Sequence, residues 1–482
     1  MYDLVVIGGG SGGLNVASAA ASVGAKVALI EKHKLGGECT HYACVPSKAL
    51  LRAAHLAHSC HVASGFGIKV GTVEVDFPSV MRRVREVVQS FYEGDSESHL
   101  REKGIDVFFG SPQFEAYDSL VIDGKTRIES RRFVIATGSR PAIPQIPGLI
   151  ETGFLDNQTL WGIEELPPSL AIVGAGPVGL EFAQAFHRLG SKVTLFDRNP
   201  EILSREEPEA AASLRERLEA EGIVIHRNVE VTGIGRKPEG VIVKFRSHTD
   251  DRAFEAVRSH LLVAAGRVAN IEGLNLEAAG IHHATAKGIP VDDYGATSAP
   301  TIYALGDVTG KDMYTHAAER EAAVVFQNAV LKIPKKGRRD AIPRTIFTEP
   351  EFASVGLTEA AARADHANVR TFTLDLGKVD RVRIDGDSGG LAKVVATESG
   401  KILGATIVGP GATLALQELV VAIDQGMTLG DLAEIVHPYP TLLSGIRTLT
   451  NQFNATKLES GLVRGALKWI YGFRPAATSK PE

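Results

Sequence analysis

Two stretches of the chain, residues 3–31 and 170–198, repeat one pattern of apolar strand, glycine-rich turn, helix and second strand. The first reads DLVVIGGG, SGGLNVASAAASVGA and KVALIE, and the second reads LAIVGAG, PVGLEFAQAFHRLGS and KVTLFDR. A strand that is apolar throughout fits a parallel sheet whose two faces are both covered. The repeat therefore predicts two βαβ units and an α/β fold.

The first glycine-rich turn, GGGSGG at 8–13, fits the GxGxxG fingerprint of a dinucleotide site. Its first glycine permits the tight turn, its second lets a pyrophosphate approach the backbone, and its third lets the helix pack closely on the strand. The helix N-terminus offers N–H groups to phosphate, and an acid at the end of the second strand can bind a ribose hydroxyl. The residues expected to bind this first dinucleotide are Gly8, Gly10, Ser11, Gly12, Gly13 and Glu31.

The second turn, GAGPVG at 174–179, repeats the fingerprint. Two such units imply two dinucleotides, and a hydride donor facing an acceptor is the simplest reason for a chain to bind both. Asp197 at the matching strand end favours a free ribose 2′-OH and hence NADH, whereas Arg198 beside it would suit the 2′-phosphate of NADPH. The residues expected here are Gly174, Gly176, Gly179, Asp197 and Arg198.

The length of 482 residues is too great for one hydrophobic core, so several domains are expected. The net charge of −5 gives no basic excess that would indicate a nucleic-acid partner. The N-terminus enters an apolar strand without a basic n-region or a cleavage site, and the longest apolar runs are too short to span a membrane. We therefore expect a cytoplasmic protein without stable membrane insertion.

Cys39 and Cys44 lie five positions apart in GGECTHYACVPSKAL, directly after the first βαβ unit. Three cysteines in a long cytosolic chain are not a disulfide framework, so a close pair suggests redox chemistry or metal binding. A redox pair is favoured, because Cys44 would lie near a helix N-terminus, where the dipole stabilises a thiolate. Inert thiols and a metal site remain as alternatives, although no metal site is predicted. The candidate extra metal ligands are His41, His55, His58, Cys60 and His61.

GGECTHYACVPSKAL resembles the GGTC-x4-C-x-PSK signature of the class I pyridine nucleotide–disulfide oxidoreductase family, with mercuric-reductase-like or dihydrolipoamide-dehydrogenase-like members as the nearest pattern. Further motifs follow in the family's order: IATG at 135–138, Glu181 after the second fingerprint, VAAGRVAN at 263–270, ALGD at 304–307 and TEPEFASVGLTE at 348–359. The resemblance runs from residue 4 to about 445, nearly the whole chain.

The resemblance implies a homodimer built from two Rossmann-like domains and a C-terminal α+β dimerisation domain. The FAD-binding domain would comprise 1–145 and 265–335, the NAD(P)-binding domain 146–264, and the dimerisation domain with its C-terminal tail 336–482. A proline-rich crossover before residue 148 and the charged stretch LKIPKKGRRDAIP at 331–343 suit these boundaries.

The resemblance also implies a route for electrons, from NADH or NADPH to FAD, then to a Cys39–Cys44 disulfide, then to an acceptor. Cys39 would meet the acceptor, Cys44 would contact the flavin, and Lys48 paired with Glu181 would lie beside flavin N5. The helix after Tyr314 would direct its positive end at the flavin ring. The further residues expected to bind FAD or NAD(P)H are Gly37, Lys48, Thr137, Gly138, Gly266, Gly306 and Asp307.

HPYPTLLS at 437–444 departs from the HPTxxE of dithiol-reducing members, whose His serves the partner subunit as acid/base. Tyr439 replaces that His and Ser444 replaces the Glu, and a phenol with a pKa near 10 is a poor base at neutral pH. Mercuric reductases also carry this Tyr, but they add a C-terminal cysteine pair, and no cysteine follows Cys60 here. His437 offers a substitute base, or is a hydrogen-bonded loop residue.

The acceptor therefore stays open among disulfides, metal ions and related acceptors. The alternatives are dihydrolipoamide dehydrogenase-type dithiol oxidation, a transhydrogenase or quinone reductase that uses the flavin directly, and a nucleotide-binding protein without catalysis. Glu38 replaces the Thr of GGTC, and the sequence offers no reason. The amphipathic C-terminal segment around Trp469, with Arg464 and Lys468, favours packing on its own dimer over contact with a membrane surface.

Overall fold

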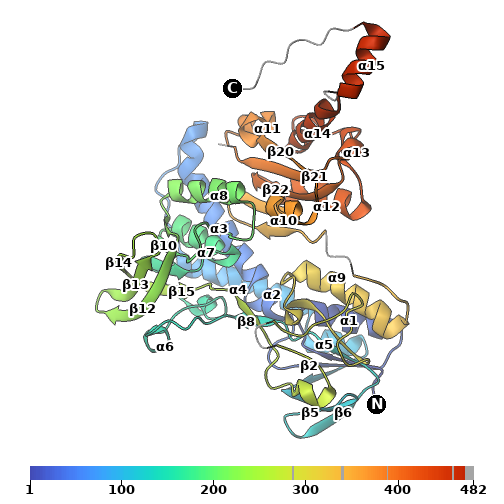
Figure 1. The fold of residues 1–482 in the computed structure, drawn as a ribbon. Helices are drawn as coiled ribbons and strands as arrows, with labels where there is room; N and C mark the ends of the chain where they lie inside the picture. The colour runs from blue at the N-terminus through green and yellow to red at the C-terminus, as the bar shows by residue number, and fades with distance from the viewer. Residues whose placement is uncertain (285–286, 338–340, 388, 459–460, 473–482) are drawn as a thin grey trace. The chain divides into compact units, whose positions relative to one another are not determined.

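The computed structural model describes residues 1–284, 287–337, 341–387, 389–458 and 461–472 (Figure 1). They form two compact units. The first comprises Met1–Ser204 with the described part of Leu218–Arg339, and the second comprises Arg205–Arg217 with the described part of Asp340–Glu482. The predicted α/β fold is confirmed, with a Rossmann-like sheet at each fingerprint.

The first fingerprint lies on a five-stranded parallel sheet in the order β17-β7-β1-β2-β3. Its middle strand, β1, is buried on both faces, because Val5 and Ile7 face one apolar cluster and Leu4 and Val6 face another. This explains why the strand sequence is apolar throughout. The strands are β1 (Leu4–Ile7), β2 (Val27–Glu31), β3 (Ile105–Phe109), β7 (Phe133–Ile135) and β17 (Ile302–Ala304).

The second fingerprint lies on a four-stranded parallel sheet in the order β11-β10-β9-β15. A three-stranded antiparallel sheet lies between its strands β11 and β15 in the chain. The parallel strands are β9 (Ser169–Val173), β10 (Lys192–Phe196), β11 (Val224–His226) and β15 (His260–Val263), and the antiparallel strands are β12 (Val229–Lys237), β13 (Gly240–Ser247) and β14 (Ala253–Arg258).

The two fingerprint turns have nearly the same backbone. Gly8 has φ +107° and Gly174 has φ +108°, a conformation that side chains oppose. A Cβ on Gly13 would collide with the carbonyl oxygen of Gly8, and a Cβ on Gly179 with that of Gly174. The repeat in sequence is therefore a repeat in structure. The helices that follow are α1 (Ser11–Ser22) and α7 (Pro177–Leu189).

The rest of the first unit supplies helices and short strands around these sheets. Its helices are α2 (Gly37–His41), α3 (Cys44–Val62), α4 (Phe77–Gly94), α5 (Glu97–Glu102), α6 (Leu149–Thr152) and α9 (Thr315–Val325). Its remaining strands are β4 (Pro112–Ala116), β5 (Ser119–Ile122), β6 (Thr126–Glu129), β8 (Ser139–Pro141) and β16 (Arg267–Ala269). The predicted division of this unit into FAD-binding and NAD(P)-binding domains stays a prediction.

The second unit is built on a five-stranded antiparallel sheet in the order β18-β19-β22-β21-β20. Helix α12 packs on its central strands, and Phe372 on the sheet meets Phe453 on α14 edge to face. The strands are β18 (Arg344–Ile346), β19 (Glu351–Gly356), β20 (Val369–Asp375), β21 (Leu391–Thr397) and β22 (Ile402–Gly409). The helices are α10 (Glu359–Asp365), α11 (Asp380–Ile384), α12 (Ala412–Gln425), α13 (Leu429–Ala433), α14 (Leu443–Leu458) and α15 (Gly461–Tyr471).

Arg205–Arg217 packs with the second unit, although both neighbouring stretches of chain belong to the first. Helix α8 (Pro208–Glu221) therefore belongs to both units, because its first ten residues, up to Arg217, lie in the second and its last four in the first. A buried ion cluster holds this segment. Lys393 Nζ lies 2.9 Å from Glu207, 2.5 Å from Glu209 and 2.7 Å from Glu359, and the side chains of Lys393 and Glu207 are each only 3% exposed.

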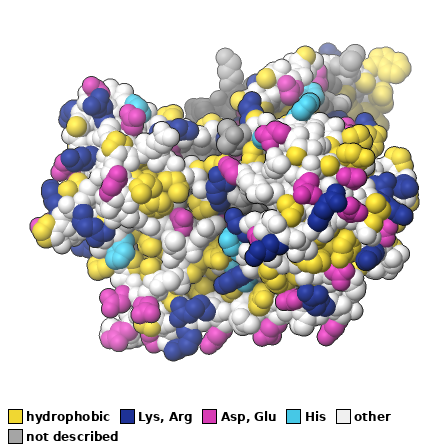
Figure 2. Space-filling view, turned by 90° about the horizontal axis from the view of Figure 1, so that it is seen from below, with side chains coloured by type: hydrophobic (Ala, Val, Ile, Leu, Met, Phe, Trp, Pro, Cys, Tyr) yellow, Lys and Arg dark blue, Asp and Glu magenta, His cyan; other side chains and the backbone are white. Residues whose placement is uncertain are grey.

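The surface carries charges of both signs. Figure 2 shows Lys and Arg side chains interspersed with Asp and Glu across one face. On helix α15, Trp469 is 88% exposed. Within the described ranges, no helix combines the length and apolar character that crossing a bilayer requires. The final residues, 473–482, lie outside the described part of the chain.

Candidate active site

The turn that carries Cys39 lies directly against the first fingerprint. The Gly36 N–H donates to the Gly9 carbonyl at 2.8 Å, and Gly36 and Gly37 both have positive φ. A Cβ on Gly37 would approach the Cα of Gly10 to 2.7 Å, so only glycine permits this contact. Cys39 follows on α2, so the double glycine before the cysteines brings this thiol beside the expected dinucleotide turn.

Cys44 is the first residue of α3, as its place before Pro-Ser-Lys suggested. Its Sγ lies 3.3 Å from the Thr315 hydroxyl at the start of α9. A hydrogen bond from Cys39 lowers the pKa of Cys44 to about 6, and Thr315 and Lys48 act in the same direction against the opposing effect of burial. The same hydrogen bond and burial raise the pKa of Cys39. The two thiols therefore differ: Cys44 is a thiolate near neutral pH, and Cys39 keeps its proton.

Lys48 and Glu181 meet, although 133 positions separate them. Lys48 Nζ on α3 lies 2.7 Å from Glu181 Oε2 on α7, and the Glu181 side chain is 7% exposed. A buried carboxylate needs a partner of this kind. The ion pair joins the helix that begins with Cys44 to the helix of the second fingerprint.

The acid of each fingerprint accepts a hydrogen bond from the glycine-rich turn of the same fingerprint. Glu31 Oε2 accepts from the Gly9 N–H at 2.7 Å, and Asp197 Oδ2 accepts from the Ala175 N–H at 2.6 Å. Each bond fixes the peptide between the first two fingerprint glycines. Arg198 is exposed beside Asp197. The acid that would suit the ribose 2′-OH of NADH and the arginine that would suit the 2′-phosphate of NADPH therefore both lie at this strand end.

The other expected cofactor-binding residues gather at one edge of the first sheet. Ile7 on β1, Ile135 on β7 and Ala304 on β17 are in register, so the residues that follow these strands emerge together. Ligands of such sheets bind at the carboxyl ends of their strands. The residues at this edge are the 8–13 turn, Thr137 and Gly138 after β7, and Gly306 and Asp307 after β17, whereas Gly266 precedes β16.

These turns leave space for a dinucleotide. A Cβ on Gly138 or on Gly176 would meet no atom within 4 Å, and one on Gly10 would meet none closer than 3.9 Å. The glycines of both fingerprints therefore open backbone N–H groups to a ligand at the N-termini of α1 and α7. The residues present fit the two dinucleotides that the fingerprints predict.

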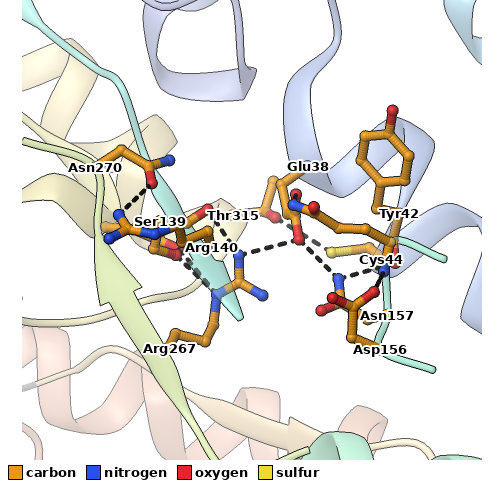
Figure 3. A network of polar contacts seen from close by, with 12 residues as sticks. Glu38, Tyr42, Cys44, Ser139, Arg140, Asp156, Asn157, Arg267, Asn270 and Thr315 are labelled. Atoms are coloured by element: carbon orange, nitrogen blue, oxygen red, sulfur yellow. Dashed lines mark hydrogen bonds and ion pairs between the residues drawn. The ribbon is translucent and has the colours of Figure 1, made fainter. Parts of the chain in front are cut away.

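Glu38 is turned away from the first fingerprint. Its carboxylate accepts from the side-chain amide of Asn157 at 2.7 Å and lies 3.2 Å from the Arg267 guanidinium (Figure 3). The Gln158 side-chain amide also donates to it, at 3.1 Å. A carboxylate directed at a pyrophosphate would repel it, and these contacts hold the Glu38 carboxylate elsewhere. Asn157, Gln158 and Arg267 were missed as functional residues, and only the arginine lay in a recognised motif, VAAGRVAN.

The C-terminal loop of the second unit is held by other carboxylates. The Tyr439 hydroxyl donates to Asp380 at 3.0 Å, and this bond raises the pKa of the phenol. His437 Nε2 lies 2.9 Å from Glu418 Oε1, and the His437 side chain is 5% exposed. Ser444 donates to the Thr441 carbonyl. The phenol is therefore an even poorer base than an ordinary tyrosine.

The extra candidate metal ligands other than His41 lie on α3. Cys39, Cys44 and Cys60 form no disulfide, and His55, His58 and His61 lie along α3. Among the residues that the structure describes, no group of three or more His, Cys, Asp or Glu side chains is arranged to hold a metal ion.

Comparison with known proteins connects this geometry to a family. Residues 2–322 match the family described as pyridine nucleotide-disulphide oxidoreductase, and residues 342–450 match the dimerisation domain of the same family. A mercuric reductase of Streptomyces lividans is 35% identical over 460 residues, which cover 94% of this chain and 96% of the relative. A dihydrolipoyl dehydrogenase of Thermus scotoductus is 36% identical over 454 residues, with 92% and 96% covered.

Among solved structures, the HOCl-induced flavoprotein disulfide reductase RclA from Escherichia coli is similar, with a TM-score of 0.82 and 28% sequence identity. The match covers 93% of this chain and 99% of RclA. A Cu(II) complex of RclA matches with the same TM-score and identity.

Proposed function

The chain belongs to the pyridine nucleotide-disulphide oxidoreductase family, and from this premise we propose that Cys39 and Cys44 are its redox-active pair. The protein is an FAD-dependent NAD(P)H oxidoreductase of this family. FAD, when bound, would accept a hydride from NAD(P)H and pass the electron pair on to a disulfide.

The observation that carries the proposal is the unequal pair of thiols. When the electron pair breaks a Cys39–Cys44 bond, one proton is taken up at neutral pH, because the pKa of Cys44 lies at about 6 and that of Cys39 is raised. Cys44 then carries the negative charge, stabilised by the Cys39 thiol and Thr315 and, at longer range, by the Lys48 charge. Cys39 is left as the protonated thiol that faces an acceptor.

The remaining expected residues would hold the cofactors. The turns at 8–13 and 137–138, with Gly37, Gly306 and Asp307, would bind FAD at the carboxyl edge of the first sheet. The turn at 174–179 with Asp197 and Arg198 would bind NAD(P)H. Lys48 and Glu181 would lie between the two, because their ion pair joins α3 to α7.

We propose an acceptor that needs thiolates more than it needs a proton shuttle, such as a thiophilic metal ion. To attack a disulfide, Cys39 must lose its proton to a base, and Tyr439 is a hydrogen-bond donor to Asp380 with a raised pKa. Metal ions bind sulfur and displace the proton themselves. Mercuric reductases among the relatives and the Cu(II) complex of RclA are in keeping with this class of acceptor.

A homodimer completes the proposal. The dimerisation domain of the family spans residues 342–450 and includes Tyr439. The resemblance implies that this residue approaches the cysteine pair of the other subunit. We also propose a cytoplasmic location, where NAD(P)H is available and thiols are kept reduced.

The test is oxidation of NADH and of NADPH by the purified enzyme with lipoamide, glutathione disulfide, Hg²⁺, Cu²⁺ and a quinone. Cys39→Ser should abolish reduction of metal ions and disulfides, because it removes the thiol that meets the acceptor. Cys60→Ser is the matched control and should leave all rates unchanged. Full activity of Cys39→Ser would reject the proposal in favour of a transhydrogenase or quinone reductase that uses the flavin directly.

A further inference from the structure

Glu38 stands next to Cys39, at a position where the family signature has threonine, and its carboxylate receives hydrogen bonds from two other parts of the chain. Asn157 and Gln158 donate side-chain N–H groups to its two oxygens, at 2.7 and 3.1 Å. Arg267 on β16 adds a guanidinium at 3.2 Å. The Glu38 side chain is 23% exposed, and that of Arg267 is 19% exposed, so water screens this ion pair only in part.

The same turn is held a second time at its other end. The Tyr42 carbonyl accepts from the Asn157 amide at 3.2 Å and from the Trp161 indole N–H at 3.1 Å. Asn157 is 7% exposed, and its neighbour Asp156 orders the segment by accepting from backbone N–H groups of the residues that follow. We call residues 157–161 the bracket. Its side chains form hydrogen bonds with Glu38 and Tyr42, at the two ends of the turn that contains Cys39.

The bracket also contacts the helix of the second fingerprint. The Trp161 ring packs on Phe182 with ring centroids 5.8 Å apart, and Phe182 directly follows Glu181 on α7. The Cys39 turn is therefore tied to the same helix as Lys48, by a separate set of contacts.

Arg267 extends the network toward the expected FAD site. Its Nε donates to the Ser139 hydroxyl at 2.7 Å, and Ser139 in turn donates to the Asp307 carboxylate. Arg267 Nε lies 3.6 Å from Asp307 as well. The guanidinium thus lies between two carboxylates, one beside Cys39 and one in the ALGD motif.

We propose that Glu38 is a positioning residue that clamps the Cys39 turn between the bracket and Arg267, and so fixes where this thiol meets an incoming acceptor. The inference rests on the proposed role of Cys39. It explains the departure from threonine, because a hydroxyl is too short and has too few lone pairs to bind three donors. A carboxylate has two oxygens, and its bonds to a guanidinium are charge-assisted and stronger than neutral ones.

The clamp predicts that loss of the carboxylate loosens residues 38–43 without removing the reactive sulfur of Cys44. The Tyr42 and Ala43 N–H groups both donate to the Glu38 carbonyl at 2.9 Å, so their hydrogen exchange reports on the turn. Cys44 keeps its contact with Thr315, which Glu38 does not touch. Loss of the Glu38 carboxylate should therefore slow reduction of the acceptor but leave the absorbance of the Cys44 thiolate unchanged.

The experiment compares Glu38→Thr and Glu38→Gln holoenzymes with wild type. Glu38→Thr should speed amide exchange of 38–43 about tenfold and lower kcat with Hg²⁺ or glutathione disulfide about tenfold. It should retain the long-wavelength charge-transfer absorbance that a Cys44 thiolate in contact with oxidised FAD would give. Glu38→Gln keeps the shape and one acceptor for Asn157, so it should fold normally and show a smaller effect of the same sign.

The matched control is Glu272→Gln, which removes a carboxylate bound to Arg140 at 2.9 Å through both oxygens but does not touch the Cys39 turn. It should leave exchange of 38–43 and kcat unchanged. Wild-type exchange and kcat in both Glu38 variants would overturn the clamp. Wild-type enzyme that lacks the charge-transfer band, or a fully active Cys39→Ser, would instead overturn the proposed function, while amide exchange would still report on the clamp.

Discussion

At the scale of single residues, the two thiols are made different by one hydrogen bond. Cys39 and Cys44 are chemically identical side chains, yet one has a raised pKa and the other a pKa lowered to about 6. The donor of a thiol–thiolate bond must keep its proton, so stabilising the anion on one sulfur prevents it on the other. In the proposed function, this asymmetry separates the sulfur that stays charged, Cys44, from the sulfur that meets the acceptor, Cys39.

A pH titration tests this asymmetry. In the two-electron-reduced enzyme, the long-wavelength charge-transfer absorbance should be present above about pH 6 and disappear as the pH falls below it, because only the Cys44 thiolate donates charge. Absorbance spectra of anaerobically reduced enzyme between about pH 5 and pH 10 measure the midpoint. Cys60→Ser should titrate identically. A midpoint near 9, the ordinary value for a thiol, would show that Cys39 does not stabilise this anion.

A contact between single residues could be predicted from the sequence where each partner lies in a recognised motif. Lys48 and Glu181 each lie in a recognised signature, and their predicted pairing is present at 2.7 Å. Prediction from the sequence failed for Glu38, because two of the three residues that bind this carboxylate, Asn157 and Gln158, lie more than a hundred positions away in a segment without a motif. The partner of an isolated acid depends on how the chain folds back, which the local sequence does not encode.

At the scale of helices and strands, the βαβ repeat could be predicted because backbone geometry demands it. Positive φ at Gly8 and Gly174, and close packing at Gly13 and Gly179, leave glycine as the only suitable residue. The place of Arg205–Arg217 could not be predicted in this way. Its sequence is a charged helix start, and only the acids on it and a lysine on a distant strand explain why it packs with the second unit.

Lys393→Met tests that packing. Burial alone would lower the pKa of Lys393, but Glu209, Glu359 and Glu207 outweigh it and raise the pKa, so the side chain is charged. Its loss leaves the buried Glu207 carboxylate without the cation that neutralises it, although the Glu359 backbone N–H still donates to its other oxygen. Breaking a buried ion pair costs about 3–5 kcal/mol of stability. Urea unfolding, followed separately for each unit, should show the loss. Lys401→Met, at an exposed lysine directly before β22, is the control and should cost less than about 0.5 kcal/mol. If Lys393→Met and Lys401→Met had the same free energy of unfolding, the proposed role of the ion cluster around Lys393 would be contradicted.

At the scale of the whole molecule, the proposed choice of acceptor depends on a residue far in sequence from the cysteines. The family match places Tyr439 in the dimerisation domain, and its hydroxyl donates to Asp380. The proposed preference for metal ions over disulfides therefore depends on assembly as well as on the cysteine pair. Sequence alone identified the missing base, because histidine and tyrosine differ in pKa wherever they lie, but it did not indicate the bond to Asp380.

Tyr439→His combined with Ser444→Glu should raise turnover with lipoamide or glutathione disulfide, by about tenfold, because it restores a base whose pKa lies near neutrality. Steady-state kinetics with each substrate measure the gain. Tyr439→Phe is the control, since it also breaks the bond to Asp380 but supplies no base, and it should bring no gain. An unchanged or lower rate in the double variant would mean that the dimer presents another group to Cys39.

Helix α8, shared between the two units, constrains how this protein can be recombined with its relatives. A chimera made by exchanging only the C-terminal segment would take its lysine from one parent and two of the three carboxylates around it from the other. Arg205–Arg217 and the C-terminal segment must therefore come from the same parent, although they are far apart in the gene. Successful grafts should therefore carry Arg205–Arg217 together with the segment that follows residue 340.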